Sequence, residues 1–90
     1  MPSIFKFLGY LIYFWSNENG EPMHVHISRG RQTSNATKVW LTHNGYAVLC
    51  HNNSKIPSID LNKLLRHISE AYEVIRDEWV HRFGYESYYC

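Results

Sequence analysis

One apolar stripe in the second half of the chain constrains the fold more than any other feature. After Pro57, apolar residues recur at spacings of three and four up to a closing Phe-Gly pair: Leu61, Leu64, Leu65, Ile68, Tyr72, Ile75, Trp79, Phe83 and Gly84. This spacing places the apolar side chains along one side of an α-helix and the intervening charged residues along the other. We therefore predict one helix over about residues 59–83, capped by Ser58 or Asp60 and ended by Gly84 in the left-handed conformation.

The first half of the chain carries patterns that are typical of β-strands. Four runs rich in β-branched and aromatic residues are separated by turn-forming residues: Gly9–Trp15, Met23–Ser28, Thr37–Leu41 and Tyr46–Cys50. The first run is apolar at every position, which favours a central strand buried on both faces. Asn44-Gly45 indicates a two-residue hairpin turn.

Together these patterns predict an α+β fold. We expect a four-stranded antiparallel β-meander within about residues 4–50, followed by one long C-terminal α-helix packed on one sheet face and a short tail over 84–90. Ninety residues allow a single domain, residues 1–90. The hydrophobic content of 44% and aromatic content of 16% exclude a disordered chain, and the net charge of +1 argues against indiscriminate polyanion binding.

The cysteines and the apolar runs indicate the compartment. Cys50 and Cys90 are the only thiols, and no spacing resembles a paired-cysteine zinc or redox motif. No apolar stretch approaches the roughly 20 residues that a membrane-spanning helix needs, and the N-terminus lacks a small-residue cleavage site. We expect a cytoplasmic protein with free thiols and no membrane association.

His24 and His26 are the strongest candidates for chemistry. They share one side of an alternating strand, which places their Cβ atoms roughly 6.5–7 Å apart. Two imidazoles at this spacing can chelate a divalent metal, exchange protons as an acid–base pair, or contact RNA; they can also be ordinary polar residues on an exposed strand. A structural zinc site would need further ligands, and the candidates are Glu18, Glu21, His43 and His51. Phosphate-loop, serine-nucleophile and His-Glu-x-x-His motifs are absent from the sequence.

The expected fold leaves the face that carries these histidines without a covering helix. If the helix packs on the face of Val25 and Ile27, then His24 and His26 lie on the other face, with Lys38 and Trp40 beside them. Exposed apolar and aromatic surface of this kind usually marks a binding site. Three kinds of contact are expected there: phosphate binding by Arg29 and Lys38, stacking on Tyr13 and Trp40, and a polar contact from Glu18.

Several of these residues together resemble a known family. An aromatic strand, an acidic turn and a proline precede His-x-His in the run Ile12-Tyr13-Phe14-Trp15-Ser16-Asn17-Glu18-Asn19-Gly20-Glu21-Pro22-Met23-His24-Val25-His26. Ala36 and Lys38 then precede Val39-Trp40-Leu41, and the helix closes with Trp79 and Phe83-Gly84. In these features the chain resembles the domain-of-unknown-function 4160 family from Ile4 to Gly84. It departs at Asn19 and Met23, where members often carry His and Pro.

The resemblance implies a small bacterial, cytoplasmic protein, often encoded beside another small protein and suspected to be half of a toxin–antitoxin pair. We expect one component of such a two-gene module, acting on RNA or the ribosome through the histidine-bearing face. His24 and His26 would serve as acid and base or as phosphate contacts, while Arg29 and Lys38 hold the backbone.

Two other functions remain open at this point. The first is a non-enzymatic module that docks a small partner protein encoded nearby, or a second copy of itself. The second is a metal-binding protein that uses His24 and His26 with a divalent ion as its one cofactor. The sequence leaves open whether the protein is an enzyme.

Overall fold

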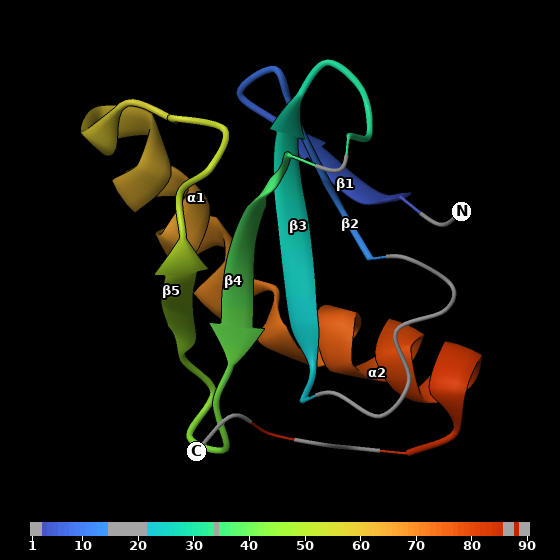
Figure 1. Cartoon of the computed structure of the whole chain (residues 1–90). Helices are drawn as coiled ribbons and strands as arrows, with labels where there is room; N and C mark the ends of the chain where they lie inside the picture. The colour runs from blue at the N-terminus through green and yellow to red at the C-terminus, as the bar shows by residue number, and fades with distance from the viewer. Residues whose placement is uncertain (1–2, 15–21, 34, 86–87, 89–90) are drawn as a thin grey trace.

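The protein is a five-stranded antiparallel sheet with two helices on one of its faces (Figure 1). The computed structural model describes residues 3–14, 22–33, 35–85 and 88. In chain order the elements are β1 (Ser3–Phe7), β2 (Tyr10–Tyr13), β3 (His24–Arg29), β4 (Thr37–Leu41), β5 (Ala47–His51), α1 (Ser58–Glu70) and α2 (Tyr72–Phe83). The strands neighbour one another in the same order. The expected α+β class, the antiparallel meander and the C-terminal helical segment are confirmed.

The prediction of four strands is wrong by one, because β1 precedes the expected first strand. It pairs with β2 through a two-residue turn, in which Phe7 lies opposite Tyr10 and both Leu8 (φ 55°) and Gly9 (φ 80°) have positive φ. Positive φ at both positions is typical of the type I′ turn, whose twist matches that of a hairpin. Leucine rarely adopts this conformation, since its Cβ then crowds the following carbonyl oxygen. Because leucine is not a typical turn residue, Leu8 does not indicate in the sequence that β1 ends and β2 begins there.

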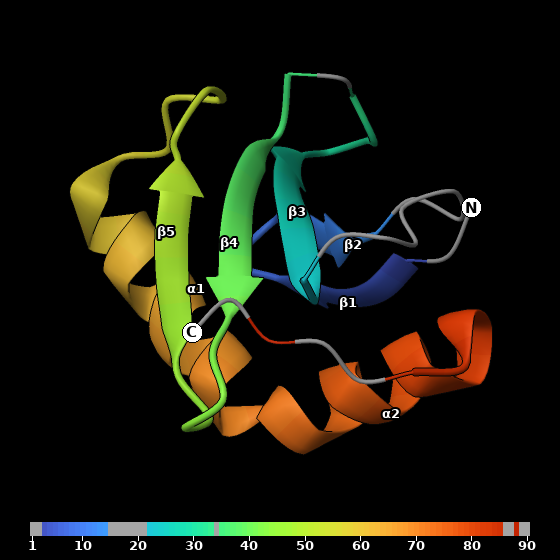
Figure 2. The same cartoon turned by 60° about the horizontal axis from the view of Figure 1, so that its bottom comes forward.

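The single long helix is also wrong in detail, because the helical segment bends at Ala71 (φ −96°, ψ 15°). Backbone hydrogen bonds run through the bend, from Ala71 N–H to the His67 carbonyl (2.9 Å) and from Ile75 N–H to the Ala71 carbonyl (3.1 Å). A straight helix over the same residues would span about 39 Å, more than the 32 Å longest dimension of the molecule. The bend lets α1 follow β5 while α2 crosses the end of the sheet (Figure 2).

The ends of the helical segment differ from each other in how they are formed. Gly84 adopts the left-handed conformation (φ 81°) and ends α2, as expected. At the other end Pro57 occupies the cap position and no side chain caps the helix, so the prediction of a Ser58 or Asp60 cap is wrong. The Asp60 carboxylate instead accepts a hydrogen bond from the Tyr10 hydroxyl (2.9 Å). Among the described residues, no helix combines the length and apolar character needed to cross a bilayer.

The main core lies between the helices and the sheet face that they cover, here called the helix face. It combines alternate residues of the strands with the helical stripe: Tyr10, Ile12, Phe14, Val25, Ile27, Val39, Leu41, Leu64, Ile68, Ile75 and Trp79. The other strand residues lie on the opposite face, here called the second face. There Leu11 and Tyr13 form a smaller buried cluster with Ala36 from the β3–β4 loop. Burial of β2 on both sides, predicted from its continuous apolar run, is confirmed.

Replacing Leu8 by asparagine tests the strain in the β1–β2 turn. Leu8 is 49% exposed, so its side chain contributes little burial, and Asn-Gly is the preferred pair for a type I′ turn. We expect Leu8→Asn to raise the free energy of unfolding by about 1 kcal/mol, measured by urea denaturation. Leu8→Ala is the matched control, since alanine has the same Cβ as asparagine but no polar group that can hydrogen-bond locally to offset its crowding; equal stability of the two variants would contradict the turn assignment.

Candidate functional site

The alternation of β3 separates its residues between the two faces as the sequence predicts. Val25 and Ile27 are fully buried on the helix face, so His24 and His26 lie on the second face. Across the strands, His26 is opposite both Tyr13 on β2 and Lys38 on β4. Residues directly opposite in an antiparallel sheet have Cβ atoms about 4.5–5.5 Å apart. The sheet therefore brings Tyr13, His26 and Lys38 into one row.

His26 is the accessible histidine of the pair. Its side chain is half-buried, between the ring of Tyr13 at 5.6 Å and the ring of His24 at 5.0 Å, both measured between centroids. The two imidazoles are almost perpendicular, with an interplanar angle of 89°. These neighbours restrict the orientation of the His26 ring and leave part of it open to solvent.

His24 is not accessible, so the prediction that it lies on an uncovered surface is wrong. Its exposed fraction is 0%, and its Nδ1 donates a hydrogen bond to the Pro22 carbonyl (2.9 Å). The ring packs edge-on against Trp40 (5.5 Å) and Trp79 (5.3 Å). α2 crosses the end of the sheet at which β3 begins (Figure 2), and its Trp79 contacts the His24 ring there. The His24 ring thus packs beside His26 and supports the site.

Lys38 and Trp40 form a cation and an aromatic surface next to His26. The Lys38 ammonium nitrogen lies 4.3 Å from the centre of the Trp40 ring, within the range of a cation–π interaction. Both side chains are half-buried, and both come from β4 at positions two residues apart. The predicted placement of Lys38 and Trp40 on the face of His26 is confirmed by the strand register.

Arg29 lies on the helix face, so its predicted place beside the histidines is wrong. Its guanidinium donates a hydrogen bond to the Tyr10 hydroxyl (2.8 Å), which itself donates to the Asp60 carboxylate (2.9 Å). The guanidinium also lies 5.2 Å from the centre of the Tyr10 ring. Arg29 is five residues after His24, an odd number, and strand alternation therefore puts it on the opposite face.

Tyr13 forms a wall of the site and does not offer an exposed stacking surface as predicted. It is fully buried, and its hydroxyl both donates to the Thr33 carbonyl and accepts from the Thr33 N–H, each at 3.1 Å. These bonds hold the β3–β4 loop over β2. The second face is therefore covered over β2 and at His24, and accessible around His26, Lys38 and Trp40.

His51, which the sequence offered only as a candidate further metal ligand, joins the same row. The β4–β5 turn is closed by Thr42 N–H bonding to the Tyr46 carbonyl (3.0 Å), so it holds three residues and not the two predicted. An irregularity between Lys38 and Val39 then shifts the pairing and places His51 opposite Lys38. The next residue, Asn52, accepts a hydrogen bond from Thr37 on the helix face (2.7 Å), so alternation directs His51 to the second face.

The remaining predicted ligands do not complete a metal site within the described residues. Glu18 lies outside the residues that the structure describes, as do Trp15 and most of the predicted turn. Among the described residues, no group of three or more His, Cys, Asp or Glu side chains comes together as a metal-binding cluster. For His24 and His26 the described residues therefore supply no third ligand.

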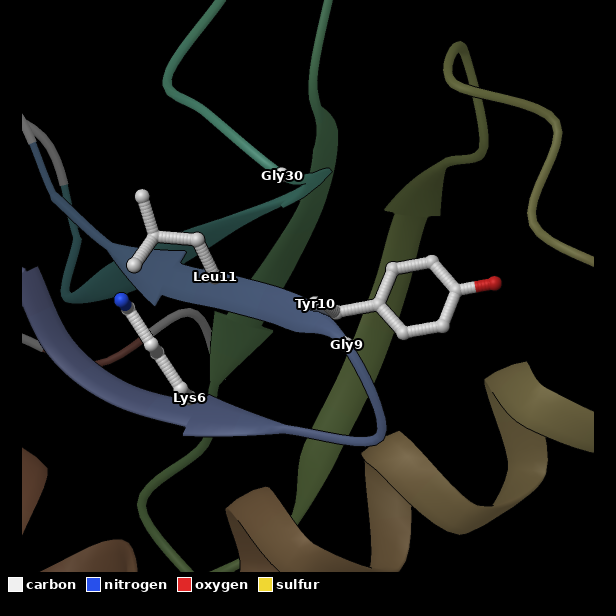
Figure 3. A pocket seen from close by; sticks show the side chains of 5 residues that line it. All are labelled: Lys6, Gly9, Tyr10, Leu11 and Gly30. Carbon is white, nitrogen blue, oxygen red and sulfur yellow. The ribbon is translucent and has the colours of Figure 1, made fainter.

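A pocket of about 210 Å³ lies near the β1–β2 turn. Its lining consists of Lys6, Gly9, Tyr10, Leu11 and Gly30. Figure 3 shows the side chains of Lys6 and Leu11 on the same side of the strands, with the Tyr10 ring directed away from them. Since Leu11 belongs to the second face, Lys6 adds a second cation to that face.

The described carboxylates are all found in the helix layer of the structure. Every described aspartate and glutamate lies in α1 or α2: Asp60, Glu70, Glu73, Asp77 and Glu78. The described charged residues of the strands are all cations: Lys6, Arg29 and Lys38. The described part of the second face consequently carries positive charge and imidazoles with no carboxylate among them.

Fold and site together define a small α+β protein with helices on one sheet face and a histidine–lysine row on the other. The family model described as Domain of unknown function (DUF4160) matches residues 9–80. The chain belongs to this family, and the resemblance seen in the sequence is confirmed. Comparison with curated proteins and with solved structures gives no match for this chain.

Alanine substitution separates the supporting histidine from the accessible one. His24→Ala removes a fully buried ring and its bond to the Pro22 carbonyl, so we expect the free energy of unfolding to fall by about 2–4 kcal/mol. His26→Ala removes a half-buried ring, and the expected loss is about 1 kcal/mol. Urea denaturation of both variants measures the difference. Losses within 0.5 kcal/mol of each other, on the order of the scatter among surface substitutions, would argue against a supporting role for His24.

Proposed function

We propose that this protein binds single-stranded RNA through the accessible part of its second face, as one component of a two-gene toxin–antitoxin-type module. The observation that carries the proposal is that the half-buried side chains of Lys38 and Trp40 lie beside His26. Proteins that bind single-stranded nucleic acid combine cations, which contact the phosphates, with aromatic rings, on which bases stack. The group supplies one of each, with an imidazole next to them.

The distribution of charge supports a local anionic ligand more than a long polyanion. The whole chain has a net charge of only +1, so electrostatic attraction over its full surface is weak. On the second face, however, the described charged residues are the cations Lys6 and Lys38. A short stretch of RNA backbone can therefore follow this face, since the described carboxylates lie in the helices on the opposite face.

RNA is favoured over duplex DNA by the shape of the site. Within the described part of the chain, the accessible surface is a patch of sheet with half-buried side chains, and no described helix lies on this face to enter a DNA major groove. Splayed bases of a single strand can reach Trp40, and imidazole and ammonium groups can bond phosphates and 2′-hydroxyls. The family resemblance adds the expectation of a toxin–antitoxin setting.

Neutralising Lys38 tests the binding site directly. We expect Lys38→Gln to weaken binding of a single-stranded oligoribonucleotide by about tenfold and to reduce the slope of log K against log [salt] by about 0.7, since one phosphate contact is lost. Fluorescence anisotropy at several salt concentrations measures both quantities. Lys63→Gln, an exposed lysine of α1, is the matched control with the same change in net charge. Equal weakening by the two substitutions would show that the second face does not hold the RNA.

Growth of a bacterial host tests the module. Expression of the wild type is expected to slow growth, and Lys38→Gln to relieve the effect, at equal protein levels on an immunoblot. His24→Ala is unsuitable here because loss of folding would relieve the effect for another reason. Equal growth inhibition by wild type and Lys38→Gln would contradict toxicity through this site.

A further inference from the structure

We infer that His26 and His51, on either side of Lys38, are the acid–base pair of a metal-independent cleavage of RNA. The inference rests on the proposed RNA binding by the second face and names the reaction that this face would perform. It replaces His24 with His51 as the second imidazole, because the strand register, and not proximity in sequence, brings His51 to the row.

The sheet places the three side chains in order across neighbouring strands. His26 is opposite Lys38, and Lys38 is opposite His51, so the two imidazoles lie two strands apart. Strands are separated by about 4.8 Å, which puts the two histidine backbones about 10 Å apart. Side chains of the two histidines can lean inward from this distance, leaving room for one phosphodiester group above Lys38.

The accessibility of the two rings distinguishes them from His24. His24 is fully buried and its Nδ1 proton is engaged by the Pro22 carbonyl. His26 and His51 are both half-buried. The Nδ1 of His51 is buried and has no hydrogen-bond partner among the described residues, so no described acceptor or donor competes for it. Such an unsatisfied buried group is unusual in a folded protein and is often found at functional sites.

The reaction is an internal transfer that needs no other reactant. One imidazole, in its neutral form, takes the proton of a ribose 2′-hydroxyl, whose oxygen attacks the adjacent phosphorus. The other imidazole, in its protonated form, gives a proton to the 5′-oxygen as its bond to phosphorus breaks. The products are a 2′,3′-cyclic phosphate and a free 5′-hydroxyl, and exchange with water restores both rings. Lys38 offsets the negative charge that develops on the non-bridging oxygens.

Cleavage of a single-stranded oligoribonucleotide of mixed sequence, with chelator present, tests the inference. The wild type is expected to give products ending in a 2′,3′-cyclic phosphate, identified by mass spectrometry. An oligonucleotide of the same sequence with 2′-deoxyribose throughout should remain intact, because it lacks the attacking oxygen. His26→Gln and His51→Gln are each expected to lower the cleavage rate at least 100-fold, in line with the loss of one proton-transfer group. RNA binding by each variant should stay within about threefold.

His81→Gln is the matched control, since His81 is an exposed histidine of α2 on the other side of the molecule. It should cleave at the wild-type rate, and circular dichroism should show native folding for every variant. RNA binding without cleavage, loss of cleavage with chelator, or an unchanged rate for His51→Gln would overturn the acid–base pair and leave the proposed RNA binding intact. Failure of the wild type to bind the oligoribonucleotide would overturn both.

Discussion

The indole of Trp79 lies where the helix layer meets the end of the sheet, and much of the structure depends on its contacts. It is fully buried and packs against Phe14 (5.3 Å) and Phe83 (4.4 Å), as well as His24 (5.3 Å). A ring of this size contributes several kcal/mol by burial alone. By filling the space at the start of β3, Trp79 links the helices to the strand that carries His24 and His26.

The same packing explains why two histidines on one side of a strand have different environments. Tyr85, just after α2, packs on Trp79 (6.4 Å), and Tyr88 contacts His43 in the β4–β5 turn (5.5 Å). Tyr85 thus packs on the indole that contacts His24, and Tyr88 packs on the β4–β5 turn. His26, one same-face position along β3, is half-buried. Its neighbours are then decided by β2 and β4.

Strand alternation, which can be read from the sequence, accounts for part of the site. It correctly separates Val25 and Ile27 from the histidines, and the same rule applied to Arg29 would have placed that residue on the helix face, where it bonds Tyr10. His51 follows from the register of one hairpin. The two-residue Asn44-Gly45 turn that the sequence predicts would pair His43 with Tyr46 and, counting back along both strands, Lys38 with His51. In the structure the three-residue turn and the irregular pairing between Lys38 and Val39 each shift the register by one residue, and the same pair results because the two shifts cancel.

The sequence by itself determined the α+β class, the order of strands before helices and the face on which each regular strand residue lies, because hydrophobic periodicity is local and follows from the geometry of each element. Only the tertiary structure decided the bend at Ala71, the burial of His24 and the placement of His26 between Tyr13 and Lys38. These features arise where elements distant in sequence compete for the same space. Their outcome depends on contacts between layers, and the spacing of residues along one strand or helix does not reveal those contacts.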